Sequence, residues 1–213
     1  MASLKRVREP YDVEFHLEHS IGTDKEAMTY YHFHNVYEIY LVITSGAEMW
    51  VGNQRYIMSP NDLLLLSTSD QHRVIVSDRK GYDRYVLYFS PLYIQPFSTN
   101  TASLLECFGI QNSNRTHCLK LSAEETRKLV SLYSRFFDLK EDRNAYAWEI
   151  KQKIILTEIL IFINEIYLEG LRQKKSDRVT SASQRLLMPI MDYIEANYDK
   201  DLNAQQVAAS FGL

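Results

Sequence analysis

Up to about residue 89, hydrophobic and polar positions follow the short alternating runs that are typical of β-strands. Residues 11–17 alternate between apolar and polar side chains, which predicts a half-buried strand. Further strands are predicted at residues 36–44, 48–51, 55–58, 63–67, 73–76 and 85–90. Gly52-Asn53 and Pro60-Asn61-Asp62 are turn sequences between these runs. Short strands at close spacing with turns between them indicate a β-barrel or jelly roll.

From residue 122 onward the pattern changes to a helical period. Ser122 and Glu125 match a capping box, which predicts a helix over residues 122–139. Its apolar stripe consists of Leu129, Leu132, Tyr133, Phe136 and Phe137. A longer helix is predicted over residues 142–171, and its apolar side chains cover more than one face. We therefore expect it to pack against the first helix and against a partner subunit; burial within its own monomer is the alternative.

The last part of the chain combines a basic segment with two short helical patterns. Residues 172–185 have no apolar period and hold several Lys and Arg residues against Asp177 alone, which is typical of a linker. A helical stripe follows, formed by Leu187, Ile190, Met191, Ile194 and Tyr198. Asn203 can cap a second helix that contains Ala208 and Ala209 and ends near Gly212. This is the front of a helix-turn-helix, and its recognition helix is expected beyond Leu213.

Composition narrows the class of protein. The chain has 213 residues, 46% of them hydrophobic and 24% charged, which suits a globular protein with a real core. The net charge of -3 gives no overall affinity for nucleic acid, so any such affinity is local. The longest apolar stretch, residues 154–163, is too short to span a bilayer. Cys107 and Cys118 are expected to be reduced thiols in a cytoplasmic protein rather than a disulfide.

The candidate chemistry lies in the first third of the chain. His32, His34 and Glu38 fall in one period-2 phase, so an extended chain points them to the same side. His72 follows the strand predicted at 63–67. Three interpretations stay open for these four residues. They bind a divalent metal such as Zn, Fe, Mn or Ni, they hydrogen-bond a polar effector such as a sugar, or they tie strand ends together.

Three more residues are candidates for the same pocket. Tyr40 is in phase with Glu38, and Trp50 and Arg55 lie on the neighbouring hairpin. An indole ring stacks well on a sugar, and a guanidinium suits a carboxylate or phosphate. Ordinary barrel wall is the alternative interpretation for Tyr40 and Trp50.

Taken in order, these motifs resemble a known family. Residues 192–198 and 202–213 resemble the first helix-turn-helix of AraC/XylS-type transcriptional regulators. His32-x-His34-x3-Glu38, Gly46, the turn at residues 60–62, His72 and residues 85–91 are similar to the cupin sensor domain of the same family. Asn61 stands where the family's turn has a glycine, and asparagine can also adopt a positive φ there.

The resemblance implies an α+β protein. It would have a cupin-type β-barrel (double-stranded β-helix, or jelly roll) over residues 1–120 and two dimerisation helices over residues 121–171. A basic linker over residues 172–185 and the start of an all-α helix-turn-helix domain over residues 186–213 would follow. It further implies a cytoplasmic homodimer that is not an enzyme, senses a small polar effector such as a carbohydrate, and needs no cofactor. Promoter DNA would be bound by the full-length protein only, and no membrane is involved. The alternative is a metal-dependent cupin enzyme, an isomerase or dioxygenase, with the four polar residues as metal ligands.

Overall fold

The computed structural model of the chain describes residues 7–9, 14–22, 30–77, 80–109, 116–142, 144–179, 190, 193–194, 197 and 203–211. Its contacts divide the chain into two compact units, Met1–Glu165 and Ile166–Leu213. The first unit contains the strands and the helices that pack on them. The boundary falls inside the longest helix.

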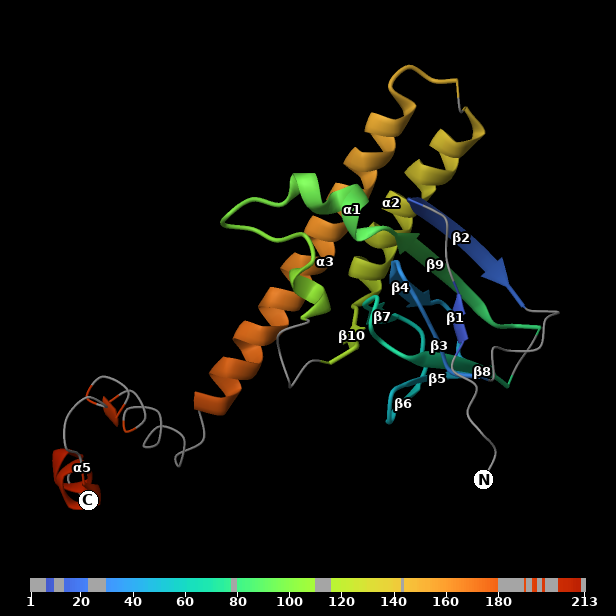
Figure 1. Cartoon of the computed structure of the whole chain (residues 1–213). Helices are drawn as coiled ribbons and strands as arrows, with labels where there is room; N and C mark the ends of the chain where they lie inside the picture. Colours follow the sequence, from blue (N-terminus) through green and yellow to red (C-terminus); the bar gives the residue numbers. More distant parts are fainter. Residues whose placement is uncertain are drawn as a thin grey trace. The chain divides into compact units, whose positions relative to one another are not determined.

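Two five-stranded sheets form the β part of the first unit (Figure 1). One sheet has the order β1 (Val7–Glu9), β3 (His32–His34), β8 (His72–Val76), β5 (Ala47–Val51) and β6 (Gln54–Ile57). The other has the order β10 (Cys118–Lys120), β7 (Asp62–Leu66), β4 (Tyr37–Val42), β9 (Asp83–Phe89) and β2 (Phe15–Ile21). Among the described strands, every pair is antiparallel except β1 with β3. The predicted jelly-roll barrel followed by helices is confirmed.

Strand β4 explains how the layers are stacked, because all six of its residues are buried. Tyr40 and Val42 belong to an apolar cluster between the sheets. Tyr37 points to the opposite face, where its ring lies 4.5 Å from the ring of Phe108 in the short 3-10 helix Glu106–Phe108. A strand with one face in the barrel and the other under a helical layer has no solvent-facing side chains. The remaining short helical segments are α1 (Pro91–Ile94) and the 3-10 turn Gln95–Phe97.

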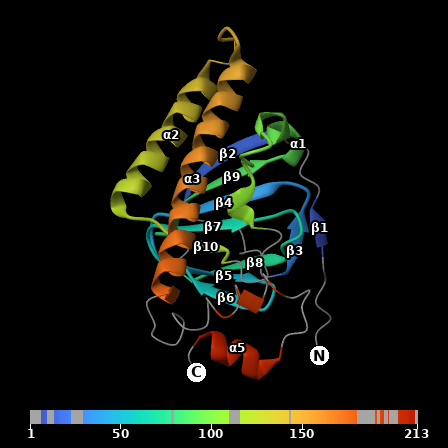
Figure 2. The same ribbon diagram turned by 90° about the vertical axis from the view of Figure 1, so that its left-hand side faces the viewer.

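Helix α2 (Ala123–Glu141) begins at the predicted capping box: the Ser122 hydroxyl accepts from the Glu125 amide, and the Glu125 carboxylate accepts from the Ser122 amide. Its aromatic stripe packs on the outer face of the second sheet. The Phe136 ring lies 4.5 Å from Phe15 of β2, and the Tyr133 ring lies 5.4 Å from Tyr85 of β9. Figure 2 shows α2 and the first part of helix α3 (Trp148–Val179) lying side by side across this sheet.

The predicted bounds of the longer helix were wrong at both ends. It begins at Trp148 instead of residue 142, because Ala147 adopts a left-handed φ of 57° and breaks the helical path there. It continues to Val179, so residues 172–179 of the predicted linker are helical. Lys, Arg and Gln are good helix formers, and no proline interrupts the segment. Residues 180–185 lie outside the described part of the chain.

Two further side chains hold α3 in the first unit. The Trp148 indole donates a hydrogen bond of 3.0 Å to the Leu139 carbonyl in the last turn of α2. The buried Asn164 amide accepts from the Cys107 amide at 2.7 Å and donates to the Leu104 carbonyl at 3.0 Å. A polar side chain therefore fixes α3 against the loop that leads to Phe108.

Three short strands were not predicted: β1, β3 and β10. Each has only three residues, too few for an alternating pattern. The strand predicted at residues 11–17 is β2, which begins at Phe15 and runs to Ile21; residues 11–13 lie outside the described part of the chain. Cys107 and Cys118 are free thiols, as predicted.

In the second unit, helix α5 (Ala204–Ser210) begins at the predicted cap. Asn203 and Gln206 form a reciprocal capping box. The helix predicted before it lies mostly outside the described residues, and so does Gly212. Across the described chain, none of the helices combines the length and the apolar character that a bilayer crossing requires.

Candidate functional site

Four polar side chains meet inside the barrel. His32 and His34 lie on β3, Glu38 on β4 and His72 at the start of β8, and all four are buried. His32 is the direct cross-strand neighbour of His72. The sequence pattern predicted that these residues lie close together, but the assumption of one continuous extended strand was partly wrong. His34 and Glu38 are not on one extended strand, because the chain crosses from one sheet to the other between them. They meet because the two sheets face each other.

The carboxylate of Glu38 is the centre of this group. Its Oε2 lies 2.8 Å from His34 Nε2 and 3.2 Å from His72 Nε2. The ligand atoms of His34, Glu38 and His72 all lie within 4.8 Å of one another. The His32 ring is adjacent, with its centroid 4.2 Å from that of His72. We call these four residues the histidine–glutamate cluster.

Backbone carbonyls fix the orientation of two of the rings. His34 Nδ1 lies 2.8 Å from the Val36 carbonyl, and His72 Nδ1 lies 2.9 Å from the Asp70 carbonyl. A carbonyl oxygen only accepts, so each Nδ1 carries the proton and each Nε2 faces Glu38. The Asp70 turn is itself held by hydrogen bonds from the Ser67 amide and hydroxyl to the Asp70 carboxylate, at 2.7 and 2.8 Å.

Charge and hydrogen bonding within the cluster shift the pKa values of Glu38 and His72 toward their charged forms. Burial on its own raises the pKa of Glu38, but the charge of His72 and the hydrogen bonds from His34 and His72 outweigh it, so the pKa lies well below its usual range. Burial likewise lowers the pKa of His72, but the neighbouring Glu38 charge outweighs this and leaves the pKa raised. The result is a buried, charge-compensated group rather than two isolated ions.

The donor set fits a divalent transition metal. Two imidazoles with Nδ1 tied to a carbonyl are the usual form of metal-binding histidines. Ligand atoms at about 2.1 Å from a zinc ion stand roughly 3 to 3.5 Å apart. The distances of 2.8 and 3.2 Å from Glu38 Oε2 to the two imidazole nitrogens are close to that spacing. The same acceptors and donors would also hydrogen-bond a polar organic ligand.

The structure does not bring the other three predicted residues to this cluster. Tyr40 points into the barrel but packs in the apolar cluster, where its hydroxyl accepts a 2.8 Å hydrogen bond from Tyr82. Burial raises the pKa of Tyr40 well above its usual value. Trp50 lies on the outer face of β5, since Met49 and Val51 take the inner face.

Arg55 lies beside Trp50 on that outer face. Its guanidinium binds the Glu48 carboxylate, which also accepts from the Trp50 indole at 2.9 Å. Arg73 of β8 stacks on the Trp50 ring, 5.1 Å from its centroid. These side chains pack against one another on the outer surface of the barrel.

Two residues near the cluster were missed by the sequence analysis, Tyr88 and His16. Tyr88 of β9 is the cross-strand neighbour of both Glu38 and His16. Its ring lies 5.8 Å from the ring of His34. The alternation in β9 was visible in the sequence, but which phase faces the cluster depends on strand pairing.

The family model described as the AraC-like ligand binding domain matches residues 18–148. No curated protein matches the chain.

Three solved structures show a distant similarity to this chain. The AraC-like transcriptional activator CuxR is 12% identical, with 84% of this chain and 57% of that chain covered and a TM-score of 0.40. ToxT from Vibrio cholerae is 11% identical, with coverages of 92% and 69% and a TM-score of 0.44. A Cupin 2 conserved barrel domain protein from Salinispora arenicola CNS-205 is 19% identical, with coverages of 41% and 72% and a TM-score of 0.32.

Proposed function

Since the chain belongs to the family of AraC-like ligand-binding domains, we propose that it is the ligand-sensing and dimerisation part of a DNA-binding transcriptional regulator. The observation that carries this proposal is the histidine–glutamate cluster, a buried polar centre in a domain whose family binds ligands. The protein acts in the cytoplasm, and its role is to bind an effector rather than to convert it.

The effector is a small polar molecule, and a carbohydrate is the class to test first. Sugar hydroxyls both donate and accept, so they can exchange hydrogen bonds with Glu38 and with the imidazoles that surround it. Such a ligand replaces the internal contacts of 2.8 and 3.2 Å with contacts of its own. Binding therefore changes the packing of β3 and β4 against each other.

A divalent ion, Zn, Fe, Mn or Ni, is the second candidate for the same position. His34, Glu38 and His72 would hold it, and His32 is close enough to contribute. When bound, such an ion supplies positive charge that can polarise a ligand oxygen. This donor set also favours the rival function, a metal-dependent cupin enzyme.

Dimerisation is proposed to use α3. Three isoleucines on one side of this helix are exposed: Ile150 by 60%, Ile154 by 47% and Ile161 by 45%. Their spacing of four and seven residues keeps them on a single stripe, as in the seam of a coiled coil. A second copy of the chain presents the same stripe and is the proposed occupant.

DNA contact is proposed for the full-length protein. Helix α5, with its Asn203 cap, is taken as the second helix of the first helix-turn-helix, and promoter DNA as the partner. Effector binding would act on the two DNA-binding domains of a dimer through α2 and α3.

The test is a set of thermal unfolding curves after treatment with a chelator. The chain is measured with a panel of sugars and separately with Zn²⁺, as the wild type, as Glu38→Gln and as His19→Gln. His19 is the matched control, because it forms a 2.8 Å imidazole–carboxylate pair with Asp83 on the surface. A ligand at about a hundredfold excess over its Kd stabilises the folded state by ~2.7 kcal/mol. We expect that stabilisation in the wild type and in His19→Gln, and its loss in Glu38→Gln.

The outcomes separate the candidates. Stabilisation by a sugar that is recovered unchanged supports the sensor. Stabilisation by Zn²⁺, with chemical conversion of an added small molecule, supports the enzyme instead. Stabilisation that survives in Glu38→Gln contradicts the cluster as the binding centre.

A further inference from the structure

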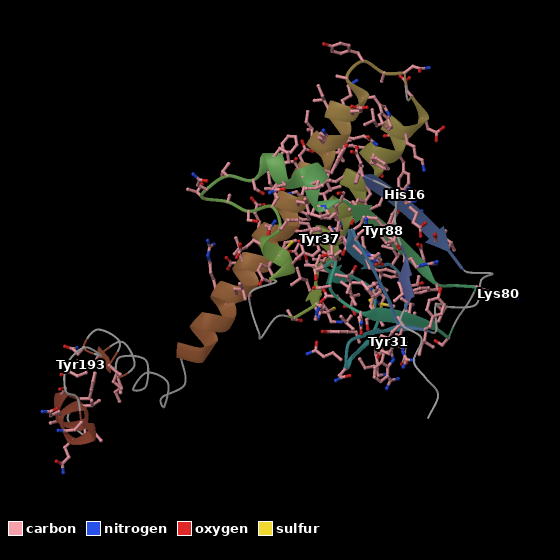
Figure 3. All side chains as sticks on the ribbon, in the orientation of Figure 1. His16, Tyr31, Tyr37, Lys80, Tyr88 and Tyr193 are labelled. Carbon is pink, nitrogen blue, oxygen red and sulfur yellow. The ribbon has the colours of Figure 1, made fainter. Side chains whose placement is uncertain are left out.

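A row of side chains runs from the edge of the second sheet to the cluster. Strand pairing places His16 of β2 opposite Tyr88 of β9, and Tyr88 opposite Glu38 of β4. Direct cross-strand neighbours project from the same face of a sheet. His16, Tyr88 and Glu38 therefore all point toward the interior of the barrel, and Figure 3 labels the first two.

Burial increases along this row. The His16 side chain is 40% exposed at the edge strand, Tyr88 is partly buried, and Glu38 is buried. The Tyr88 ring contacts a histidine ring on either side of it. It stacks on His16 with centroids 6.5 Å apart, and its edge-to-face contact with His34 has centroids 5.8 Å apart. One aromatic ring thus stands between a surface imidazole and a buried one.

The backbone on either side of this ring is continuously paired. Strand β2 pairs with β9 from Phe15 to Ile21, and β9 pairs with β4 from Tyr37 to Val42. Parting these strands would break several ladder hydrogen bonds at once. A change of the Tyr88 side-chain rotamer breaks none of these backbone hydrogen bonds. The Tyr88 ring can therefore move while both ladders stay intact.

We propose that Tyr88 is the gate of the histidine–glutamate cluster, and that small polar solutes reach His34 and Glu38 when its ring turns away from the row that begins at His16. This inference rests on the proposed function, because it treats the cluster as the binding centre. It assigns His16 to the entrance and Tyr88 to the control of access.

The test measures access without any ligand. The hydrogen on C2 of each imidazole exchanges with heavy water, and the masses of peptide fragment ions report the rate for each histidine separately. The variants are Tyr88→Val, which removes the ring but keeps a strand-forming residue, and Tyr88→Phe, which keeps the ring. Tyr85→Val is the matched control, because Tyr85 lies on the same strand but faces α2.

In the wild type we expect His34 to exchange far more slowly than His16. Tyr88→Val should raise the His34 rate roughly tenfold or more, since exchange of a shielded group follows the fraction of time it is uncovered. Tyr88→Phe and Tyr85→Val should leave the His34 rate near the wild-type value. Two results overturn the gate: an unchanged His34 rate in Tyr88→Val, or an equal rise in Tyr85→Val, which would mean general loosening of the barrel.

Failure of the gate and failure of the proposed function are distinguishable. If the His34 exchange rate depends on the Tyr88 ring while neither sugars nor Zn²⁺ stabilise the chain, the gate is supported and the proposed binding centre is contradicted. If a ligand stabilises the chain but the His34 exchange rate does not depend on Tyr88, the binding centre is supported and the gate is contradicted.

Discussion

At the scale of single residues, the cluster depends on which nitrogen of each ring faces inward. His34 and His72 each bind a main-chain carbonyl two residues away, through Nδ1. The sequence shows the residue types but not the course of the backbone, so the four members were predictable and their orientation was not.

For Trp50 and Arg55, in contrast, the prediction was wrong although the sequence contained the information needed to correct it. Met49 and Val51 are the apolar phase of β5, so their alternation already indicated that Trp50 faces outward.

The thiol of Cys118 gives a prediction at this scale. Burial and the neighbouring Asp62 carboxylate raise the pKa of Cys118 from 9.0 to about 11. A raised pKa keeps the thiol protonated, and only the thiolate reacts. Alkylation of Cys118 by iodoacetamide at pH 8 should therefore be about a hundredfold slower than in the urea-unfolded chain. Rates at each pH, read from peptide masses, check this. The rate should keep rising up to about pH 11; a plateau by pH 9 would contradict the assignment.

At the scale of elements, segments with a strong sequence pattern were predictable. Three-residue strands and the polar end of α3 were not. The capping box fixed the start of α2 from two residues, Ser122 and Glu125. Asn61 takes the predicted positive φ, 70°, in the turn before β7. The end of α3 was wrong because a polar segment without an apolar stripe resembles a linker, although its residues favour a helix.

The α2 cap gives a prediction for an element. Ser122→Ala removes the hydroxyl that accepts from the Glu125 amide, so one amide of the first turn loses its partner. We expect the free energy of unfolding to fall by about 1 kcal/mol. Urea denaturation measures it. Ser134→Ala in the same helix is the control, because that exposed hydroxyl only bonds back to the Val130 carbonyl. Equal losses in the two variants would rule out a specific role for the cap.

At the scale of the whole molecule, the cluster and α2 are separated by a single sheet. Glu38 and Tyr37 are adjacent on β4 and point to opposite faces, one into the barrel and one toward the helical layer. A ligand that displaces Glu38 therefore acts on a strand that also supports that layer. Allostery further requires two packings with different effector affinity. The sequence predicted the parts of this arrangement but not their stacking, which depends on long-range strand pairing.

The proposed dimer interface on α3 leads to a prediction about the dimer Kd. Replacing both Ile154 and Ile161 with Glu places two charges in the proposed seam of α3, where burial of an unpaired charge is costly. We expect the dimer Kd to rise by about a hundredfold or more, as measured by sedimentation equilibrium. Ile57→Glu is the control, since Ile57 is 69% exposed on strand β6, in the other sheet. A dimer that tolerates the α3 substitutions but not Ile57→Glu would move the interface to that sheet.

The two-sided burial of β4 also restricts how this sequence can change in length. Side chains alternate along a strand, so one inserted residue before Glu38 would exchange the two faces. The carboxylate would then meet the aromatic layer around Phe108, and an apolar neighbour would take its place among the imidazoles. Two inserted residues would restore the alternation. Related chains should therefore differ in length at exposed turns such as Gly52-Asn53 and keep β4 at constant length.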